Sequence, residues 1–83
     1  MYTMVLSPRD AYFAPYEYVE IKDSVGRVSS EVVTLYPPGI PLLVPGEEIS
    51  PEAVDYLLSM ASHGARIDGI RDGEPPCLRV LRN

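Results

Sequence analysis

The chain has 83 residues and a net charge of −5, and 46% of its residues are hydrophobic. This length allows one small domain, which we expect to span residues 1–83. The acidic balance disfavours nucleic acid as a partner, because phosphate binding needs a basic face. No apolar run approaches the roughly 18 residues of a membrane helix, so no membrane contact is expected. The single cysteine, Cys77, cannot form an internal disulfide, and a cytoplasmic location is the default expectation.

The first part of the chain predicts a short helix followed by a strand. In LSPRDAYFA, Ser7 suits the N-cap and Pro8 the first helical position, and Pro15 ends the helix. The next stretch, YEYVEI, covers residues 16–21 and alternates imperfectly, which predicts a strand. KDSVGR then predicts a turn or a single helical turn, with Asp23 as a cap and Gly26 as the breaker.

The middle of the chain predicts two strands separated by rigid turns. The longest expected strand covers residues 28–36, which are rich in β-branched side chains. It must end, or lie at a sheet edge, at Pro37-Pro38, because neither proline can donate a ladder hydrogen bond. Pro38-Gly39 and Pro45-Gly46 each suit the central positions of a type II turn. Between them, residues 42–44 predict a buried strand paired with its neighbour.

The last part predicts a second helix and two further strands. Ser50 suits the N-cap and Gly64 the residue just past the helix end. The apolar stripe of this helix is expected to comprise Val54, Leu57, Leu58 and Ala61. ARIDGI predicts a short strand with a turn at Gly69, and CLRVL predicts a terminal strand. The order of elements indicates an α+β fold, with a small mixed or antiparallel sheet and two helices in a single domain.

Residues for catalysis or metal binding are nearly absent. The only histidine, His63, lies at a helix end, and Cys77 is expected to be a small buried hydrophobe. Their spacing is not that of a metal site, and no P-loop, nucleotide fingerprint or hydrolase elbow is present. The only lysine, Lys22, is expected to be solvated beside Asp23, whereas a Schiff-base lysine needs a desolvated pocket. We therefore expect no catalytic, cofactor-binding or metal-binding residue in this chain.

The acidic pair Glu47 and Glu48 allows two interpretations. The plain one is a solvated acidic loop that precedes a helix N-terminus, where negative charge is favourable. The functional one is a fixed anion that faces a cationic ligand. Tyr36 poses the same choice between packing and function. A rigid Pro-Gly backbone suits a surface that must fit another surface without an ordering cost.

Three stretches resemble one known family. SPRDAYFAP, VGRVSSEVVTLYPPGIPLLVPGEEI and YLLSMASHGARIDGI are similar to the C-terminal domain of the bacterial Orn/Lys/Arg decarboxylases, which are fold-type I enzymes that use pyridoxal phosphate. The resemblance covers about Leu6 to Val80, and YPPGIPLLVPGE is its most specific part. Departures are mild: Ser24 and Ser30 replace the usual alanine, Val28 a frequent isoleucine and Leu35 a common proline.

The resemblance implies that this chain is a fragment of a larger enzyme. In the family, a large preceding domain holds the Schiff-base lysine and the histidine that stacks on the cofactor. The chain alone should then bind no pyridoxal phosphate and be inactive. Its rigid loop would pack on the missing domain and help form the active-site entrance, where an acidic rim attracts a cationic amino acid. The residues expected in this docking and entrance loop are Tyr36, Pro37, Pro38, Gly39, Ile40, Pro41, Pro45, Gly46 and Glu47.

The alternative is a stand-alone binding or regulatory module derived from that domain, with a specific partner. The fragment hypothesis predicts an exposed apolar patch around Leu42, Leu43 and the tyrosines, because the natural docking surface is missing. Such a patch could also produce a homo-oligomer.

Overall fold

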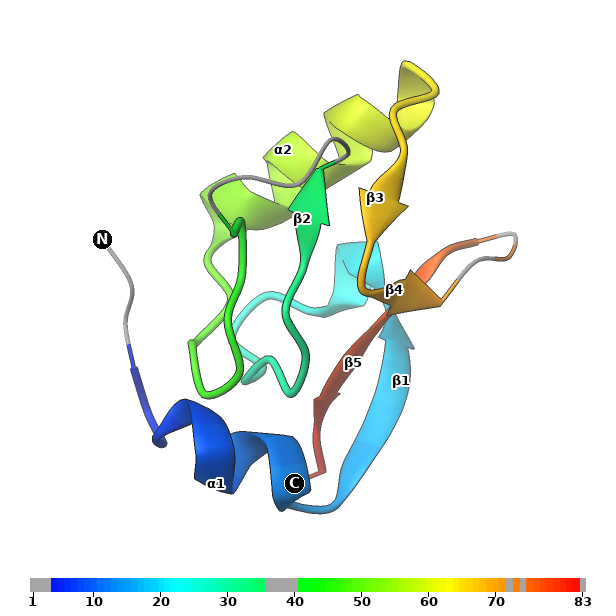
Figure 1. Ribbon diagram of the computed structural model, residues 1–83. Helices are drawn as coiled ribbons and strands as arrows, with labels where there is room; N and C mark the ends of the chain where they lie inside the picture. The colour runs from blue at the N-terminus through cyan, green and yellow to red at the C-terminus, as the bar shows by residue number, and fades with distance from the viewer. Residues whose placement is uncertain (1–3, 36–40, 72, 74, 83) are drawn as a thin grey trace.

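The computed structural model describes residues 4–35, 41–71, 73 and 75–82 (Figure 1). Two α-helices, one 3₁₀ helix and five strands occur in these residues. In chain order they are α1 (Pro8–Phe13), β1 (Tyr16–Glu20), the 3₁₀ helix η1 (Ile21–Asp23), β2 (Thr34–Leu35), α2 (Pro51–Ser62), β3 (Ile67–Asp68), β4 (Ile70–Arg71) and β5 (Cys77–Leu81). None of the described helices is long and apolar enough to cross a membrane.

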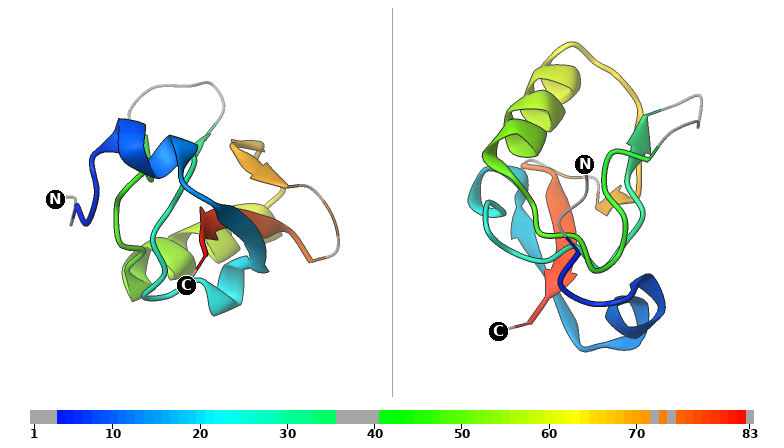
Figure 2. Two further views of the ribbon diagram at one scale, coloured as in Figure 1. Left: turned by 90° about the horizontal axis from the view of Figure 1, so that it is seen from below. Right: turned by 90° about the vertical axis from the view of Figure 1, so that its left-hand side faces the viewer.

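The strands form two antiparallel sheets. A three-stranded sheet has the order β1-β5-β4, and a two-stranded sheet pairs β2 with β3. The β1–β5 ladder runs from the pair Tyr16–Leu81 to the pair Glu20–Cys77. The helices lie at opposite ends of the molecule, with β1 and β5 between them (Figure 1 and Figure 2). The predicted α+β fold is confirmed.

Both helices begin where the sequence predicts. The Ser7 hydroxyl accepts the Asp10 N–H at 3.2 Å, which satisfies one of the free donors in the first turn of α1. The Ser50 hydroxyl accepts the Ala53 N–H at 3.1 Å in the same way at the start of α2. Gly64 follows α2 with φ of +79°, a conformation that glycine adopts without steric cost.

The hydrophobic core joins α2 to both sheets. One side of α2 contributes Val54 and Leu57, whereas Leu58 is 40% exposed and does not belong to the buried stripe, contrary to the prediction. Because β5 alternates, Leu78 and Val80 point inward and are almost fully buried. The buried core residues are Ile21, Val33, Leu43, Ile49, Val54, Leu57, Ile67, Leu78 and Val80.

The long strand predicted for residues 28–36 is wrong. Of the described residues in this segment, 28–35, only Thr34–Leu35 form a regular strand, β2. The preceding residues make isolated bridges from Val28 to Glu48, from Ser29 to Val80 and from Val33 to Leu43. The segment thus changes neighbours along its length. The Ser29 hydroxyl also donates to the Glu31 carbonyl at 2.9 Å, a local bond that competes with a ladder.

The strand predicted at residues 42–44 is also wrong, because an isolated bridge replaces a continuous ladder there. Leu43 makes one bridge with Val33, and the two residues exchange backbone hydrogen bonds. The expected burial is confirmed only at its centre, since Leu43 is fully buried and both neighbours are half-buried. Leu43 therefore anchors this loop in the core, and Leu42 packs against the core beside it.

Candidate functional site

Only part of the predicted docking loop can be described. Tyr36, Pro37, Pro38, Gly39 and Ile40 lie outside the described residues, and with them the turn predicted at Pro38-Gly39. The turn predicted at Pro45-Gly46 is confirmed. The Glu47 N–H donates to the Val44 carbonyl at 3.2 Å, and Gly46 has φ of +92°.

The described part of the loop faces the interior of this domain. Pro45, Gly46 and Glu47 are buried, and Pro41 is half-buried. Leu43 has 0% exposure and Leu42 is half-buried, so the exposed patch expected at the two leucines is wrong. The backbone explains this burial, because the loop is bonded to the preceding irregular segment: the Gly46 N–H donates to the Ser29 carbonyl at 2.8 Å. The part of that prediction that concerns the tyrosines is confirmed for Tyr12, Tyr16, Tyr18 and Tyr56, which are exposed.

Glu47 and Glu48 differ sharply in environment. Glu47 is only 8% exposed, and its Oε1 accepts the Val44 N–H at 3.1 Å across the turn. Burial raises the pKa of the Glu47 carboxyl above its ordinary value of 4.5, although the hydrogen bond from Val44 opposes this rise. Glu48 is exposed. The interpretation as a solvated loop therefore holds for Glu48 and is wrong for Glu47.

The Pro45-Gly46 turn holds the N-terminal segment of the chain. The Gly46 carbonyl accepts the N–H groups of Val5 at 2.7 Å and Leu6 at 3.4 Å, and Met4 bridges Glu47. A Cβ on Gly46 would overlap the Leu6 carbonyl oxygen, so only glycine allows this approach. The side chains of residues 4–6 are nevertheless exposed. The segment is thus held through its backbone.

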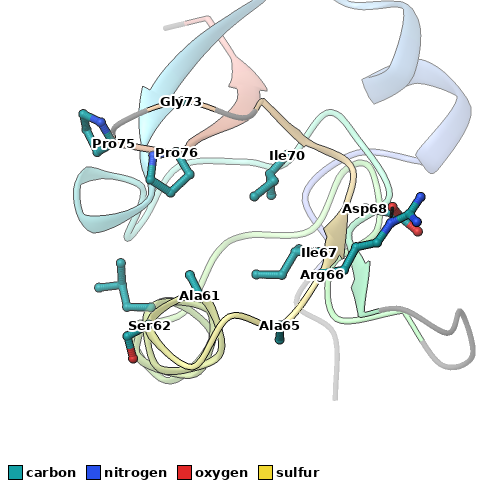
Figure 3. A pocket seen from close by; sticks show the side chains of 11 residues that line it. Ala61, Ser62, Ala65, Arg66, Ile67, Asp68, Ile70, Gly73, Pro75 and Pro76 are labelled. Atoms are coloured by element: carbon teal, nitrogen blue, oxygen red, sulfur yellow. Dashed lines mark hydrogen bonds and ion pairs between the residues drawn. The ribbon is translucent and has the colours of Figure 1, made fainter.

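A groove of about 790 Å³ opens between the second half of α2, β3 and β4, and the residues Gly73, Pro75 and Pro76 (Figure 3). Ile67 and Ile70 point into it, and Pro75 and Pro76 form the opposite wall. At its edge, Arg66 Nε lies 3.3 Å from Asp68 Oδ1. The groove can accept an apolar group, but no nucleophile is paired with a base among the described residues that line it. Sequence reasoning missed it because its walls come from three separate segments.

A second feature missed by sequence reasoning is a row of rings and guanidinium groups on the outer face of the three-stranded sheet. We call it the aromatic row. Its order is Phe13, Tyr12, Arg79, Tyr16, Tyr18 and Arg71. Alternation along β1 places Tyr16 and Tyr18 on one face, a signal that the sequence did contain. The arginines that join the rings come from the far end of the chain.

The residues that the sequence singled out for chemistry are dispersed. Lys22 Nζ lies 3.9 Å from Glu20 Oε2 and its side chain is 66% exposed, so its partner is Glu20 and not the predicted Asp23. Such an exposed ammonium does not fit a Schiff-base site for pyridoxal phosphate. His63 is exposed and its Nδ1 lies 2.7 Å from the Ser59 carbonyl at the end of α2. Cys77 is half-buried, less than predicted. Across the described residues, no three His, Cys, Asp or Glu side chains gather to hold a metal ion.

Comparison with known proteins identifies the family of this chain. Residues 1–72 match the family described as "Orn/Lys/Arg decarboxylase, C-terminal domain". The chain is 41% identical over 80 residues to the arginine decarboxylase of Halalkalibacterium halodurans and 35% identical over 79 residues to that of Bacillus subtilis. These matches cover 96% and 95% of this chain and 16% of each relative.

A solved structure agrees with the sequence relatives. The constitutive lysine decarboxylase of E. coli superposes with a TM-score of 0.84 at 32% identity, over 99% of this chain and 14% of that one. The chain therefore spans less than a fifth of the length of the decarboxylases that it matches. It belongs to the family of Orn/Lys/Arg decarboxylase C-terminal domains.

Proposed function

We infer that this chain acts as the C-terminal domain of a pyridoxal-phosphate-dependent decarboxylase of a basic amino acid in the cytoplasm. In this proposal it packs on the cofactor-binding domain and contributes to the active-site entrance, and it is inactive alone. The observation that carries the proposal is the match over nearly the whole chain to decarboxylases about six times as long.

The chemistry of the described residues is consistent with a cofactor that is bound by another domain and not by this chain. The only lysine is exposed and paired with a carboxylate, so the cofactor would be held by the preceding domain. Pyridoxal phosphate supplies the electron sink that decarboxylation of an amino acid requires. This chain would supply surface, shape and charge around the opening through which the substrate passes.

In this proposal, different parts of the loop have different roles. Pro45, Gly46 and Glu47 are buried and hydrogen-bonded within the domain, so they would form the rigid base of the loop. For Tyr36 to Pro41 the proposed role remains that of the active-site entrance. Of the two acidic residues, the exposed Glu48 is the one able to attract a distal ammonium or guanidinium group.

Steady-state kinetics on the longer polypeptide that carries this chain tests the proposal. Release of CO₂ from arginine, lysine and ornithine should identify the substrate, and Glu48→Gln should raise KM at low salt with little change in kcat. Glu52→Gln is the matched control, because Glu52 is also exposed but lies in the first turn of α2. Absence of CO₂ release from all three basic amino acids would contradict the proposed decarboxylase activity. An unchanged KM and salt dependence for Glu48→Gln would contradict the proposed role of Glu48.

The alternative is a stand-alone binding module, and the size of the native polypeptide distinguishes it from the proposed enzyme domain. An antibody against this domain should detect a native polypeptide several times longer than 83 residues. A native polypeptide of 83 residues would favour the module, and the search would then turn to its binding partner and to self-association.

A further inference from the structure

We propose that the aromatic row is the surface on which the rest of the decarboxylase polypeptide packs. This inference rests on the proposed function and adds to it the location of the contact. The row lies on the outer face of the three-stranded sheet and on α1.

The row is continuous. The Tyr12 and Phe13 rings meet edge to face with centroids 5.2 Å apart. The Arg79 guanidinium lies 5.2 Å from the Tyr12 centroid and 3.8 Å from that of Tyr16, so it joins α1 to β1. Tyr16 contacts Tyr18 at 5.9 Å, and Arg71 covers the Tyr18 ring at 5.1 Å. Six side chains from α1, β1, β5 and β4 thus form one strip.

The centre of the row is rigid. Arg79 Nη1 lies 3.3 Å from Glu31 Oε2, and its Nη2 donates to the Tyr12 carbonyl at 3.2 Å. The Arg79 side chain is only 14% exposed, although the rings that it supports are open to solvent. A surface fixed before binding loses little conformational entropy on contact. Tyrosine and arginine are also the residue types that dominate the energetics of protein interfaces.

The distribution of exposed apolar side chains identifies the occupant. Among the described residues, eleven large hydrophobic side chains are exposed, and seven of them lie in residues 4–18. Phe13 is the extreme case at 75%. In a C-terminal domain the remaining polypeptide joins at the N-terminal side, next to these residues. A concentration of apolar surface beside that junction fits a covering by the preceding domain better than random exposure.

The other candidate surfaces are weaker. The described part of the docking loop is buried inside this domain, and the groove beside α2 is lined by several small or aliphatic side chains with an internal ion pair at its edge. Neither presents a fixed row of large rings. The partner surface is therefore expected to be apolar, with carbonyl or carboxylate oxygens placed to accept from the arginine at the exposed end of the row.

Four tyrosines provide an internally controlled test. Tyr12, Tyr16 and Tyr18 are 45%, 46% and 43% exposed, and Tyr56 on α2 is 44% exposed. Covalent tyrosine labelling, read by mass spectrometry, should therefore modify all four at comparable rates in the free 83-residue chain. In the longer polypeptide that carries this chain, the three tyrosines of the row should label about fivefold more slowly, as expected for burial in an interface core. Tyr56 should be unchanged.

A variant adds an independent measurement. Phe13→Ser should leave the melting temperature of the free chain unchanged, because its ring is exposed there, but should lower that of this domain in the longer polypeptide. Tyr56→Ser is the control and should have no differential effect.

The outcomes separate the two proposals. A longer polypeptide in which Tyr56 is protected and the row is not, or in which all four tyrosines label alike, overturns the location and leaves the proposed function standing. Protection of the row in the free chain at rising concentration overturns it too, since the occupant is then a second copy. A native polypeptide of only 83 residues overturns both.

Discussion

Substitution of Gly46 by alanine tests whether the Pro45-Gly46 turn holds the N-terminal segment. The substitution meets two obstacles. Gly46 has φ of +92°, and its Cβ would overlap the Leu6 carbonyl oxygen. Gly64 has a similar φ of +79°, but its Cβ would meet no atom within 4 Å. Gly64→Ala is therefore a matched control that carries the backbone strain without the collision.

The two variants should differ measurably in stability. A left-handed conformation costs an alanine about 1–2 kcal/mol, which is the whole expected effect of Gly64→Ala. Gly46→Ala should in addition release the backbone hydrogen bonds from Val5 and Leu6, at about 1 kcal/mol each. We expect a total loss of about 3–4 kcal/mol for Gly46→Ala, and a domain of this size loses about 4–8 °C of melting temperature per kcal/mol.

Thermal and urea denaturation followed by circular dichroism gives the two free energies. Amide hydrogen exchange should show where the difference arises, with faster exchange at Val5 in Gly46→Ala and wild-type exchange there in Gly64→Ala. Equal losses of stability in the two variants, with Val5 still protected in both, would refute the role assigned to the turn.

Three further predictions concern buried polar groups. The Ser30 hydroxyl is buried without a hydrogen-bond partner among the described residues, whereas that of Ser24 donates to a carbonyl at 2.7 Å. Ser30→Ala should therefore raise the free energy of unfolding by about 1 kcal/mol and Ser24→Ala lower it by a similar amount, and urea titrations showing equal signs would contradict this. Arg79→Lys should destabilise by about 2 kcal/mol, because lysine cannot reach both acceptors and stack on a ring, while the exposed Arg66→Lys should stay within about 0.5 kcal/mol. The folded-state pKa of Glu47 is raised, so the native state holds its proton more tightly and stability should fall as pH rises from 4.5 through that pKa. Glu47→Gln should lose this part of the pH dependence in denaturation curves, and a wild-type profile in this variant would disprove the assignment.

The helices could be predicted from the sequence because their signals are local. Ser7-Pro8 and Ser50-Pro51 each place a cap and a first-turn proline side by side, and both helices begin there. The positive φ of Gly46 and Gly69 also follows from short patterns. Such features depend on residues that are neighbours along the chain.

The extent of the strands and the character of the site depend on distant residues. The segment from Val28 to Val33 alternates like a strand, but it meets different partners at successive residues and forms no continuous ladder. Glu47 is buried partly because an N-terminal segment some forty residues away bridges it. Arg79 stacks beside Tyr12, 67 residues earlier in the chain. No local pattern indicates these contacts.

The position of β5 in the middle of the order β1-β5-β4 has a consequence for how the domain is made. During synthesis β1 emerges first, yet its ladder partner, residues 77–81, emerges more than fifty residues later. Until then neither β1 nor β4 has its neighbour, and the tyrosines of β1 stand on an unpaired strand. Sheets closed by such distant segments form late, since the loop between them must be ordered first. Ribosome-bound chains should therefore become resistant to protease only after residue 81 has left the exit tunnel. A folded domain would then indicate that translation has gone past β5.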